Sequence, residues 1–215
     1  MKSLIRTISV ITLAFLFFAC DAQSQKKQDV RKIPLKAPKG KAIAAFASGC
    51  FWCSEHIFEA VAGVDSAVSG YAGGHKPNPY YELVNTETTG HAESVLVYYN
   101  PKVISYAELS KVFFASHDPT TPDQQGPDRG SSYRSILFYN SPAELAVAKQ
   151  AVRDASKSGR FKKPIVTELK PLKEFYRAES YHQDYIEKHP NDPYVRSVSI
   201  PRYKLFTKTY KGKLK

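Results

Sequence analysis

Apolar runs and helical spacings alternate along most of the chain and predict strands separated by helices of moderate length. Residues 41–47 form a short apolar run that is typical of a buried strand, and the run ends at Ser48-Gly49. Residues 51–62 then follow helical spacing, with an apolar face and Gly63 as a stop signal. The pattern therefore predicts a strand, a tight turn, and Cys50 at the beginning of a helix.

The rest of the pattern continues this alternation and indicates an α+β protein. Further strands are expected at residues 64–71, 93–99, 134–139 and, as an edge strand, 165–169. Helices are expected from capping signals at Ser105 and at Ser141, where Pro142 follows, and over residues 178–188. Two long polar segments, 73–92 and 118–132, are expected to be functional loops. The expected architecture is a two-layer α/β sandwich, a mixed sheet with helices packed on it.

The N-terminal residues are typical of an export signal. Lys2 and Arg6 precede an apolar stretch at 8–18, which is too short to span a membrane comfortably and ends at Ala19-Cys20. The sequence around Cys20 resembles a lipoprotein cleavage site, and ordinary secretion is the alternative. We therefore expect a signal peptide of the lipoprotein type over residues 1–20 and a periplasmic or cell-envelope protein that is lipid-anchored through Cys20.

The remaining boundaries follow from composition. Residues 21–40 are polar, lysine-rich and interrupted by proline, so we expect a flexible tether. We place the folded domain at residues 41–200 and a basic tail at 201–215. The formal net charge of +11 raises the possibility of nucleic-acid binding, but the lysines are dispersed and form no dense stripe on a helix. A solvated surface, or weak attraction to anionic lipid, accounts better for the charge.

Cys50 and Cys53 are spaced as Cys-x-x-Cys, which several kinds of site use. A structural zinc ion needs four ligands, and the sequence contains no second pair of cysteines or suitably spaced histidines, so we expect no metal. A purely structural disulfide would close a very small loop and stabilise little. A thioredoxin-like dithiol exchanger is a stronger alternative, since amides at a helix N-terminus lower the pKa of a cysteine. Here, however, Phe51 and Trp52 lie between the thiols. Two bulky aromatic residues at this place are typical of an apolar wall that holds a substrate beside an ionised nucleophile.

These residues resemble the signature of the A-type peptide methionine sulfoxide reductases. The resemblance extends over residues 42–190 and includes, in family order, Gly49-Cys50-Phe51-Trp52, Gly70-Tyr71-Ala72-Gly73-Gly74, Pro77-Asn78-Pro79-Tyr80-Tyr81, Thr89-Gly90-His91-Ala92-Glu93, His117-Asp118-Pro119, Gln125-Gly126-Pro127-Asp128-Arg129-Gly130, Tyr133-Arg134-Ser135 and His182-Gln183. It implies a ferredoxin-like α/β sandwich, in agreement with the pattern above.

The resemblance also implies an activity, the reduction of methionine (S)-sulfoxide, free or in proteins, without a metal or organic cofactor. Cys50 would attack the sulfoxide sulfur and become a sulfenic acid. Phe51 and Trp52 would hold the methyl group, and Glu93 would donate a proton to the oxygen. The remaining substrate-binding residues would be Tyr81, Tyr133 and Asp128.

The chain departs from the family pattern at its thiols. The segment after Tyr194 contains no cysteine, whereas many members resolve the sulfenic acid with C-terminal cysteines. Cys53, at a position where many members have glycine, is the remaining partner for Cys50. We expect a Cys50–Cys53 disulfide that a thioredoxin-like protein reduces. We expect a monomer, because nothing in the sequence indicates an oligomer.

Overall fold

The computed structural model describes residues 30–215, so the predicted signal peptide and Cys20 lie outside the described residues. The strands are β1 (Arg31–Lys32), β2 (Ala42–Ser48), β3 (Val64–Ala72), β4 (Ala92–Tyr99), β5 (Gln124–Gln125), β6 (Asp128–Arg129), β7 (Ser135–Tyr139), β8 (Glu168–Pro171) and β9 (Phe175–Arg177). The helices are α2 (Phe51–Glu59), α3 (Tyr81–Val84), α4 (Tyr106–Ser116), α5 (Pro142–Lys157), α6 (Tyr185–Lys188) and α7 (Ile200–Thr209), with short turns η1 (Ser131–Tyr133), η2 (Ser180–His182) and η3 (Val195–Ser199).

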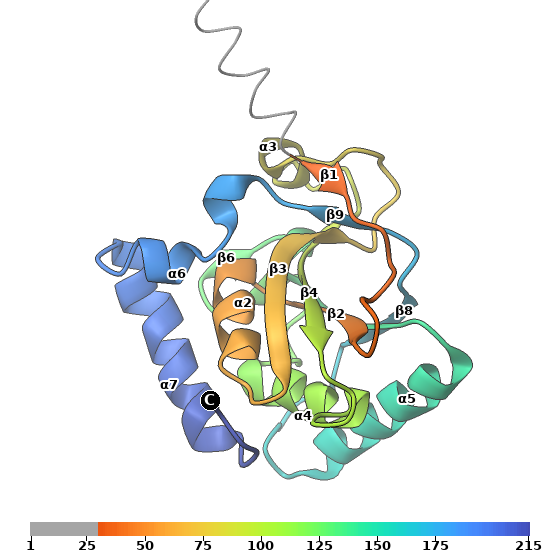
Figure 1. The fold of residues 1–215 in the computed structure, drawn as a ribbon. Coiled ribbons are helices and arrows are strands. Elements are labelled where there is room, and N and C mark those ends of the chain that lie inside the picture. The colour runs from red at the N-terminus through yellow and green to blue at the C-terminus, as the bar shows by residue number, and fades with distance from the viewer. Residues whose placement is uncertain (1–29) are drawn as a thin grey trace, which may run out of the picture.

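Seven strands form one mixed sheet in the order β1-β9-β3-β4-β2-β7-β8. Neighbouring strands are antiparallel except β7 and β8, which run parallel. The long central strands β3, β4 and β2 lie beside α2, to its right in Figure 1. This arrangement confirms the expected α+β class with a mixed sheet and packed helices.

The two faces of the sheet have separate hydrophobic cores, because successive side chains of a strand point to opposite faces. Phe46 of β2 faces α2 and α4, where its ring stacks on Phe58 at a centroid distance of 4.6 Å. The neighbouring Ala45 faces the other core, which contains Leu96 and Phe138. The helices α2, α4, α5 and α7 thus gather around the first face (Figure 1).

The described part of the predicted tether, residues 30–40, is ordered against the domain, and this prediction was wrong for those residues. Arg31 pairs with Arg177 and Lys32 with Tyr176, which adds β1 to the edge of the sheet. The following apolar residues pack against the second core: Ile33, Leu35 and Ala37. They cover the sheet face that the helices leave open.

The predicted basic tail is also part of the domain. Residues from 200 form α7, whose Phe206 is fully buried and stacks on Tyr210. Leu214 forms a bridge with Val61, so the C-terminal residues close over the end of α2. The lysines of this segment point outward while its aromatic residues fill the first core.

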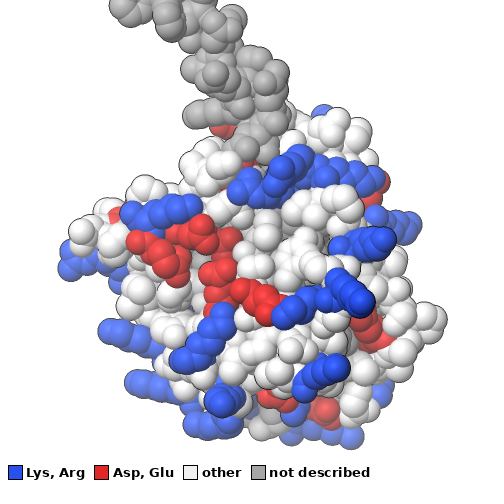
Figure 2. Space-filling model, in the orientation of Figure 1, with Lys and Arg blue, Asp and Glu red and all other residues white. Residues whose placement is uncertain are grey.

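Most of the predicted elements are present, and two differ. The edge strand is present as β8, although it begins at Glu168 rather than 165. The helix predicted over 178–188 is instead the short turn η2 and the single helical turn α6, separated by Asp184 with a φ of 53°. Within residues 30–215, none of the helices combines the length and the apolar character that crossing a membrane requires. Figure 2 shows basic side chains dispersed over one face around a band of acidic ones.

Candidate active site

Cys50 lies in the tight turn between β2 and α2, as the sequence predicted. Gly49 has a φ of 83°, and a Cβ atom there would come within 2.4 Å of the Gln125 Cβ, so only glycine fits the turn. Cys50 is the N-cap residue of α2, and its side chain is 6% exposed. The turn therefore places the thiol at the first turn of a helix and beside a pocket.

A cavity of about 350 Å³ opens in front of this thiol and contains most of the predicted site. Its lining comprises Cys50, Phe51, Trp52, Tyr81, Glu93, Asp128, Tyr133, Asp192 and Tyr194. Seven of these nine were predicted. Of the predicted site residues, only Cys53 is not part of the lining, because its side chain points into the protein. The volume is in the range that binds small ligands.

Glu93 is the buried acid of the pocket. It lies near the start of β4, where its side chain is 2% exposed and Oε2 accepts a hydrogen bond from the Phe51 amide at 2.9 Å. Burial raises the pKa of Glu93 to about 8, and the nearby Asp128 charge adds to the effect. The Phe51 bond opposes the rise but does not cancel it. Glu93 is therefore predominantly protonated at neutral pH and is able to donate a proton.

Two tyrosines from the long loops complete the polar part of the pocket. Tyr81 begins α3, and its amide donates to Glu179 Oε1 at 2.9 Å. Tyr133 ends η1, a turn held by Glu87, whose carboxylate accepts bonds from Ser131 and Ser132. Burial raises the pKa of both tyrosines, so both remain neutral phenols that can donate hydrogen bonds.

Phe51 and Trp52 form the apolar part of the pocket, which we call the aromatic wall. The Phe51 ring is buried and packs at 4.8 Å from the His182 ring. The Trp52 indole stacks on Tyr185 at 3.6 Å, and its Nε1 donates to His182 Nδ1 at 3.0 Å. His182 therefore holds both aromatic residues in place.

Asp128 faces the thiols from the opposite side of the pocket. Its Oδ2 accepts a hydrogen bond from the Tyr194 hydroxyl at 2.5 Å. Tyr194 is positioned in turn by Asp192, whose Oδ1 accepts from the Tyr194 amide at 2.8 Å. The C-terminal segment thus contributes a side of the pocket.

The family model described as peptide methionine sulfoxide reductase matches residues 42–214. The chain belongs to this family. The peptide methionine sulfoxide reductase MsrA of Saccharolobus solfataricus is 46% identical over 173 residues, which is 80% of this chain and 97% of that protein. The MsrA of Thermus thermophilus is 47% identical with the same coverage.

Two solved structures have the same fold as this chain and are related to it in sequence. Reduced Mxr1 from Saccharomyces cerevisiae has a TM-score of 0.67 at 40% identity and covers 73% of this chain and 91% of that one. Methionine sulfoxide reductase A of Corynebacterium diphtheriae has a TM-score of 0.65 at 32% identity and covers 72% and 78%. The chain is therefore an oxidoreductase of the peptide methionine sulfoxide reductase family.

In this member of the peptide methionine sulfoxide reductase family the two described cysteines are free thiols hydrogen-bonded to each other. Burial raises the pKa of Cys50 well above its ordinary value, and the Cys53 and Glu93 charges act in the same direction. The hydrogen bond from Cys50 lowers the pKa of Cys53 to about 6. Burial thus opposes ionisation of Cys50 in the free enzyme, whereas the hydrogen bond between the thiols favours ionisation of Cys53.

The residues that the sequence analysis missed come from the C-terminal segment and from the support of the pocket. Asp192 and Tyr194 line the cavity, although no periodicity or motif distinguishes them in the sequence. His182 was assigned no chemistry, yet it bonds to the aromatic wall. Proximity in the fold, rather than a local pattern, defines Asp192 and Tyr194, whereas His182 lies in a family motif whose role in the pocket the sequence did not show.

Proposed function

We propose that this protein reduces methionine (S)-sulfoxide, free or in oxidised proteins, to methionine, and that Cys50 is its nucleophile. One observation supports the proposal above all others. A thiol, a protonated carboxyl group and an aromatic wall face the same cavity of about 350 Å³. A sulfoxide presents a matching set of groups: an electrophilic sulfur, a basic oxygen and an apolar methyl group.

The reaction begins with attack of the Cys50 sulfur on the sulfoxide sulfur. In the resting enzyme the two thiols share one negative charge, and Cys50 holds the proton in its hydrogen bond to Cys53. The proton moves along this bond as Cys50 attacks. The sulfoxide gains two electrons and leaves as the thioether, while its oxygen remains on Cys50 as a sulfenic acid.

The sulfoxide oxygen becomes more basic as the attack proceeds, and Glu93 protonates it. A carboxyl group with a pKa of about 8 is protonated at neutral pH and is closely matched to that task. The Tyr81 and Tyr133 hydroxyls stabilise the oxygen by hydrogen bonds, since burial keeps both phenols neutral. Asp128 and Tyr194 order the opposite side of the pocket through their mutual bond.

The aromatic wall selects the substrate through its methyl group. Phe51 is 1% exposed and cannot move aside, while stacking on Tyr185 holds the Trp52 indole. An apolar surface next to a polar oxygen site orients the sulfoxide, and a chiral sulfur then fits in one configuration. This supports selectivity for a single epimer, and membership of the family indicates that it is the S epimer.

Cys53 is the partner that resolves the sulfenic acid. Its sulfur attacks Cys50 Sγ, an S–S bond forms, the S–O bond breaks and the oxygen departs as water. The two thiols already interact in the folded protein, which favours this step. A thioredoxin-like dithiol then reduces the Cys50–Cys53 disulfide, and the dithiol becomes oxidised in exchange.

A single-turnover experiment tests this function. Reduced protein is mixed with an excess of a chromophoric methionine (S)-sulfoxide, and the released methionine derivative is counted. We expect one equivalent per protein from wild type and from Cys20→Ser, and none from Cys50→Ser. A protein that reduces disulfides but leaves the sulfoxide unchanged would instead be a dithiol exchanger.

We further propose that the protein is exported and lipid-anchored through Cys20, where it repairs proteins of the cell envelope. The basic residues Lys2 and Arg6, the apolar stretch at 8–18 and Ala19-Cys20 support this. Mass spectrometry of the mature protein tests it. A lipidated Cys20 at the N-terminus is expected, and an intact Met1 in the membrane-free fraction would contradict it.

A further inference from the structure

The resolving thiol lies in a buried site formed by the C-terminal segment, outside the substrate pocket. Cys53 is 1% exposed, and its Sγ is hydrogen-bonded to Ser199 Oγ at 3.2 Å. Ser199 is itself 1% exposed and ends η3, a π-helical turn directly before α7. Such turns occur frequently at functional sites. The hydroxyl is thus fixed beside the sulfur, where it can donate to a thiolate.

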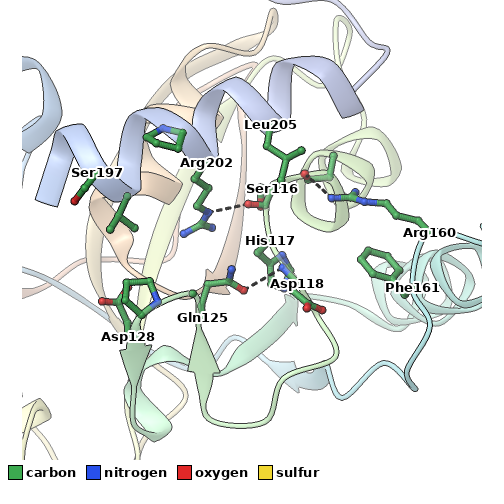
Figure 3. A pocket seen from close by; sticks show the side chains of 15 residues that line it. Ser116, His117, Asp118, Gln125, Asp128, Arg160, Phe161, Ser197, Arg202 and Leu205 are labelled. Atoms are coloured by element: carbon green, nitrogen blue, oxygen red, sulfur yellow. Dashed lines mark hydrogen bonds between the residues drawn. The ribbon is translucent and has the colours of Figure 1, made fainter.

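Arg202 brings a positive charge to the same place. It lies three residues after Ser199, so both side chains project from the same face of the helix. Its Nη2 donates to the Ser48 carbonyl at 2.7 Å and its Nε to the Ser116 carbonyl at 2.8 Å. Figure 3 shows Arg202 reaching from α7 towards Ser116, at the edge of a second cavity of about 500 Å³. These bonds fix a guanidinium group whose charge acts on Cys53.

The contacts of Arg202 also connect it to the turn that holds Cys50. Ser48, which accepts from Arg202, has its Oγ 2.8 Å from the Ser54 Oγ. The Ser54 hydroxyl donates to the Cys50 carbonyl at 3.2 Å. The guanidinium group is therefore connected by hydrogen bonds to the Cys50 end of the Cys-x-x-Cys turn.

The titratable and charged groups that interact with Cys53 come from several elements and are Cys50, Arg202, Asp128, Glu93 and Tyr194. The Asp128 charge opposes a thiolate at Cys53. Glu93 is predominantly neutral at pH 7, because its pKa is about 8. Arg202 is the cation of this set. A thiolate at Cys53 thus depends on Arg202, the Ser199 hydroxyl and the hydrogen bond from Cys50.

We propose that Ser199 and Arg202 are positioning residues that keep Cys53 as the thiolate which attacks the sulfenic acid of Cys50. The inference rests on the proposed function of Cys50 and Cys53 and adds the groups that make the second step fast. The Cys53 sulfur forms the S–S bond with Cys50 Sγ, and the S–O bond breaks. Cys53 received the Cys50 proton in the first step and gives it to the departing hydroxide, which leaves as water. The Ser199 hydroxyl and the Arg202 charge favour this loss of the proton, because both stabilise the Cys53 thiolate.

The same arrangement favours the return step. Cys50 Sγ faces the substrate cavity, whereas Cys53 is enclosed by Ser199 and the first core. The thiolate of the reductant therefore attacks Cys50, and Cys53 is the leaving group. A thiol that is stabilised as an anion leaves faster, and a nucleophile whose pKa is near the ambient pH is also close to its optimum for attack. One stabilised thiolate thus serves both directions.

The first test titrates Cys53 directly. In the full chain carrying Cys20→Ser and Cys50→Ser, Cys53 is the remaining cysteine, and its ionisation is followed by the ultraviolet absorbance of the thiolate from pH 5 to pH 10. We expect Arg202→Met and Ser199→Ala to shift the midpoint upward, and Arg202→Lys to shift it less than Arg202→Met. Arg160→Met is the matched control, because Arg160 lines the same second cavity and donates to the Phe114 and Ala115 carbonyls. Unchanged midpoints in both Arg202→Met and Ser199→Ala would overturn the proposal.

The second test separates the two chemical steps in a chain with Cys50 and Cys53 intact. After one mixing with sulfoxide, methionine release, dimedone-trapped sulfenic acid and disulfide are measured in the same samples. Arg202→Met is expected to release one equivalent of methionine, to accumulate sulfenic acid and to form the disulfide ~10-fold more slowly at pH 7, with recovery near pH 9.

Two outcomes of this second test are distinguishable. If wild type releases no methionine, the proposed function fails. If wild type releases methionine and Arg202→Met forms the disulfide at the rate of wild type and Arg160→Met, only the role of Arg202 fails. Ser199→Ala removes a single hydroxyl, so it repeats the test without disturbing the backbone contacts of Arg202.

Discussion

Glu93→Gln is the variant that most sharply tests the proposed proton donor. Glutamine has nearly the shape of the protonated carboxyl group and keeps an oxygen that can accept from the Phe51 amide. It cannot release a proton to the sulfoxide oxygen. A positioned general acid accelerates a reaction by about 10²–10⁴-fold. We expect a loss in this range in the rate of methionine release at pH 7, measured in a single turnover.

The same substitution should stabilise the protein at high pH. Glu93 ionises near 4.5 in the unfolded chain and near 8 in the folded protein, because burial penalises its charge. Stability is therefore lost as pH rises from 4.5 to 8, and this pKa difference corresponds to at most ~5 kcal/mol above pH 8. Glu93→Gln removes the penalty. Its free energy of unfolding in urea should exceed that of wild type at pH 9 and equal it at pH 4.

Glu55→Gln, on helix α2, provides the matched control. Glu55 is also buried with a pKa of about 8, but it accepts from the Ser69 and Asp184 amides and does not line the pocket. We expect wild-type activity and a smaller stabilisation at pH 9, since glutamine keeps one of two acceptors. If Glu93→Gln retains the wild-type rate, or if its stability relative to wild type is independent of pH, the reasoning about Glu93 is wrong.

Three further changes address other parts of the structure. Cys53→Ser should release close to one equivalent of methionine and then stop in the presence of thioredoxin, as counted by chromatography; continued turnover at the wild-type rate would show that an external thiol resolves Cys50. Trp52→Ala should raise the KM for the sulfoxide about 10-fold, the equivalent of roughly 1.4 kcal/mol of lost contact, while Trp52→Phe should raise it less; equal KM values would contradict the role of the aromatic wall. Phe206→Ala should lower the free energy of unfolding by ~3–5 kcal/mol in urea titrations, and a change below ~1 kcal/mol would mean that α7 is dispensable to the core.

Local signals in the sequence predicted the elements that depend on local contacts. The helices α4 and α5 begin where capping signals placed them: Ser105 accepts from the Glu108 amide and Ser141 from the Glu144 amide, each at 3.1 Å. The turn at Gly49 was equally predictable from its flanking apolar runs. These elements could be predicted because the residues that determine them are neighbours in the chain.

The long-range parts of the fold left no comparable signal. The strand β1 is two residues long and exists because Arg31 and Lys32 pair with β9, far along the chain. In α7 the lysines dominate the composition, although Phe206 and Tyr210 are four residues apart and stack in the core. The lysine-rich composition of this segment predicts a solvated tail and conceals the two buried aromatic residues. Their spacing of four residues is the signal that indicates a helix with one apolar face.

The pocket itself was predicted from family motifs rather than from periodicity. Residues from three separate loops and β4 meet at Cys50, and no spacing rule connects Trp52 with Tyr133. The environment of Cys50 could not be predicted for a related reason. A helix N-terminus favours a thiolate, but burial next to Cys53 and Glu93 outweighs it, and burial is a property of the assembled fold.

The resting site holds the protons that one turnover consumes. In the proposed resting state Cys50 and Glu93 are protonated and Cys53 is a thiolate, because burial raises the pKa of Cys50 and Glu93 and the hydrogen bond from Cys50 lowers the pKa of Cys53. Conversion of a sulfoxide to a thioether and water requires two protons and two electrons. The two thiols supply the electrons by forming the disulfide, and Cys50 and Glu93 supply the protons. One turnover thus transfers a negative charge from Cys53 to Glu93.

This balance predicts that the first turnover takes up almost no protons from solution. Weakly buffered wild-type protein at pH 7, mixed with sulfoxide and a pH indicator, should release methionine with little change in absorbance. Glu93→Gln lacks one of the two protons, so it should take up about one proton for each disulfide that it forms. An uptake of one proton by wild type would mean that Cys53 or Glu93 does not hold the assigned charge. When a dithiol later reduces the disulfide, it gives up two protons. One returns to Cys50, and Glu93 recovers the other.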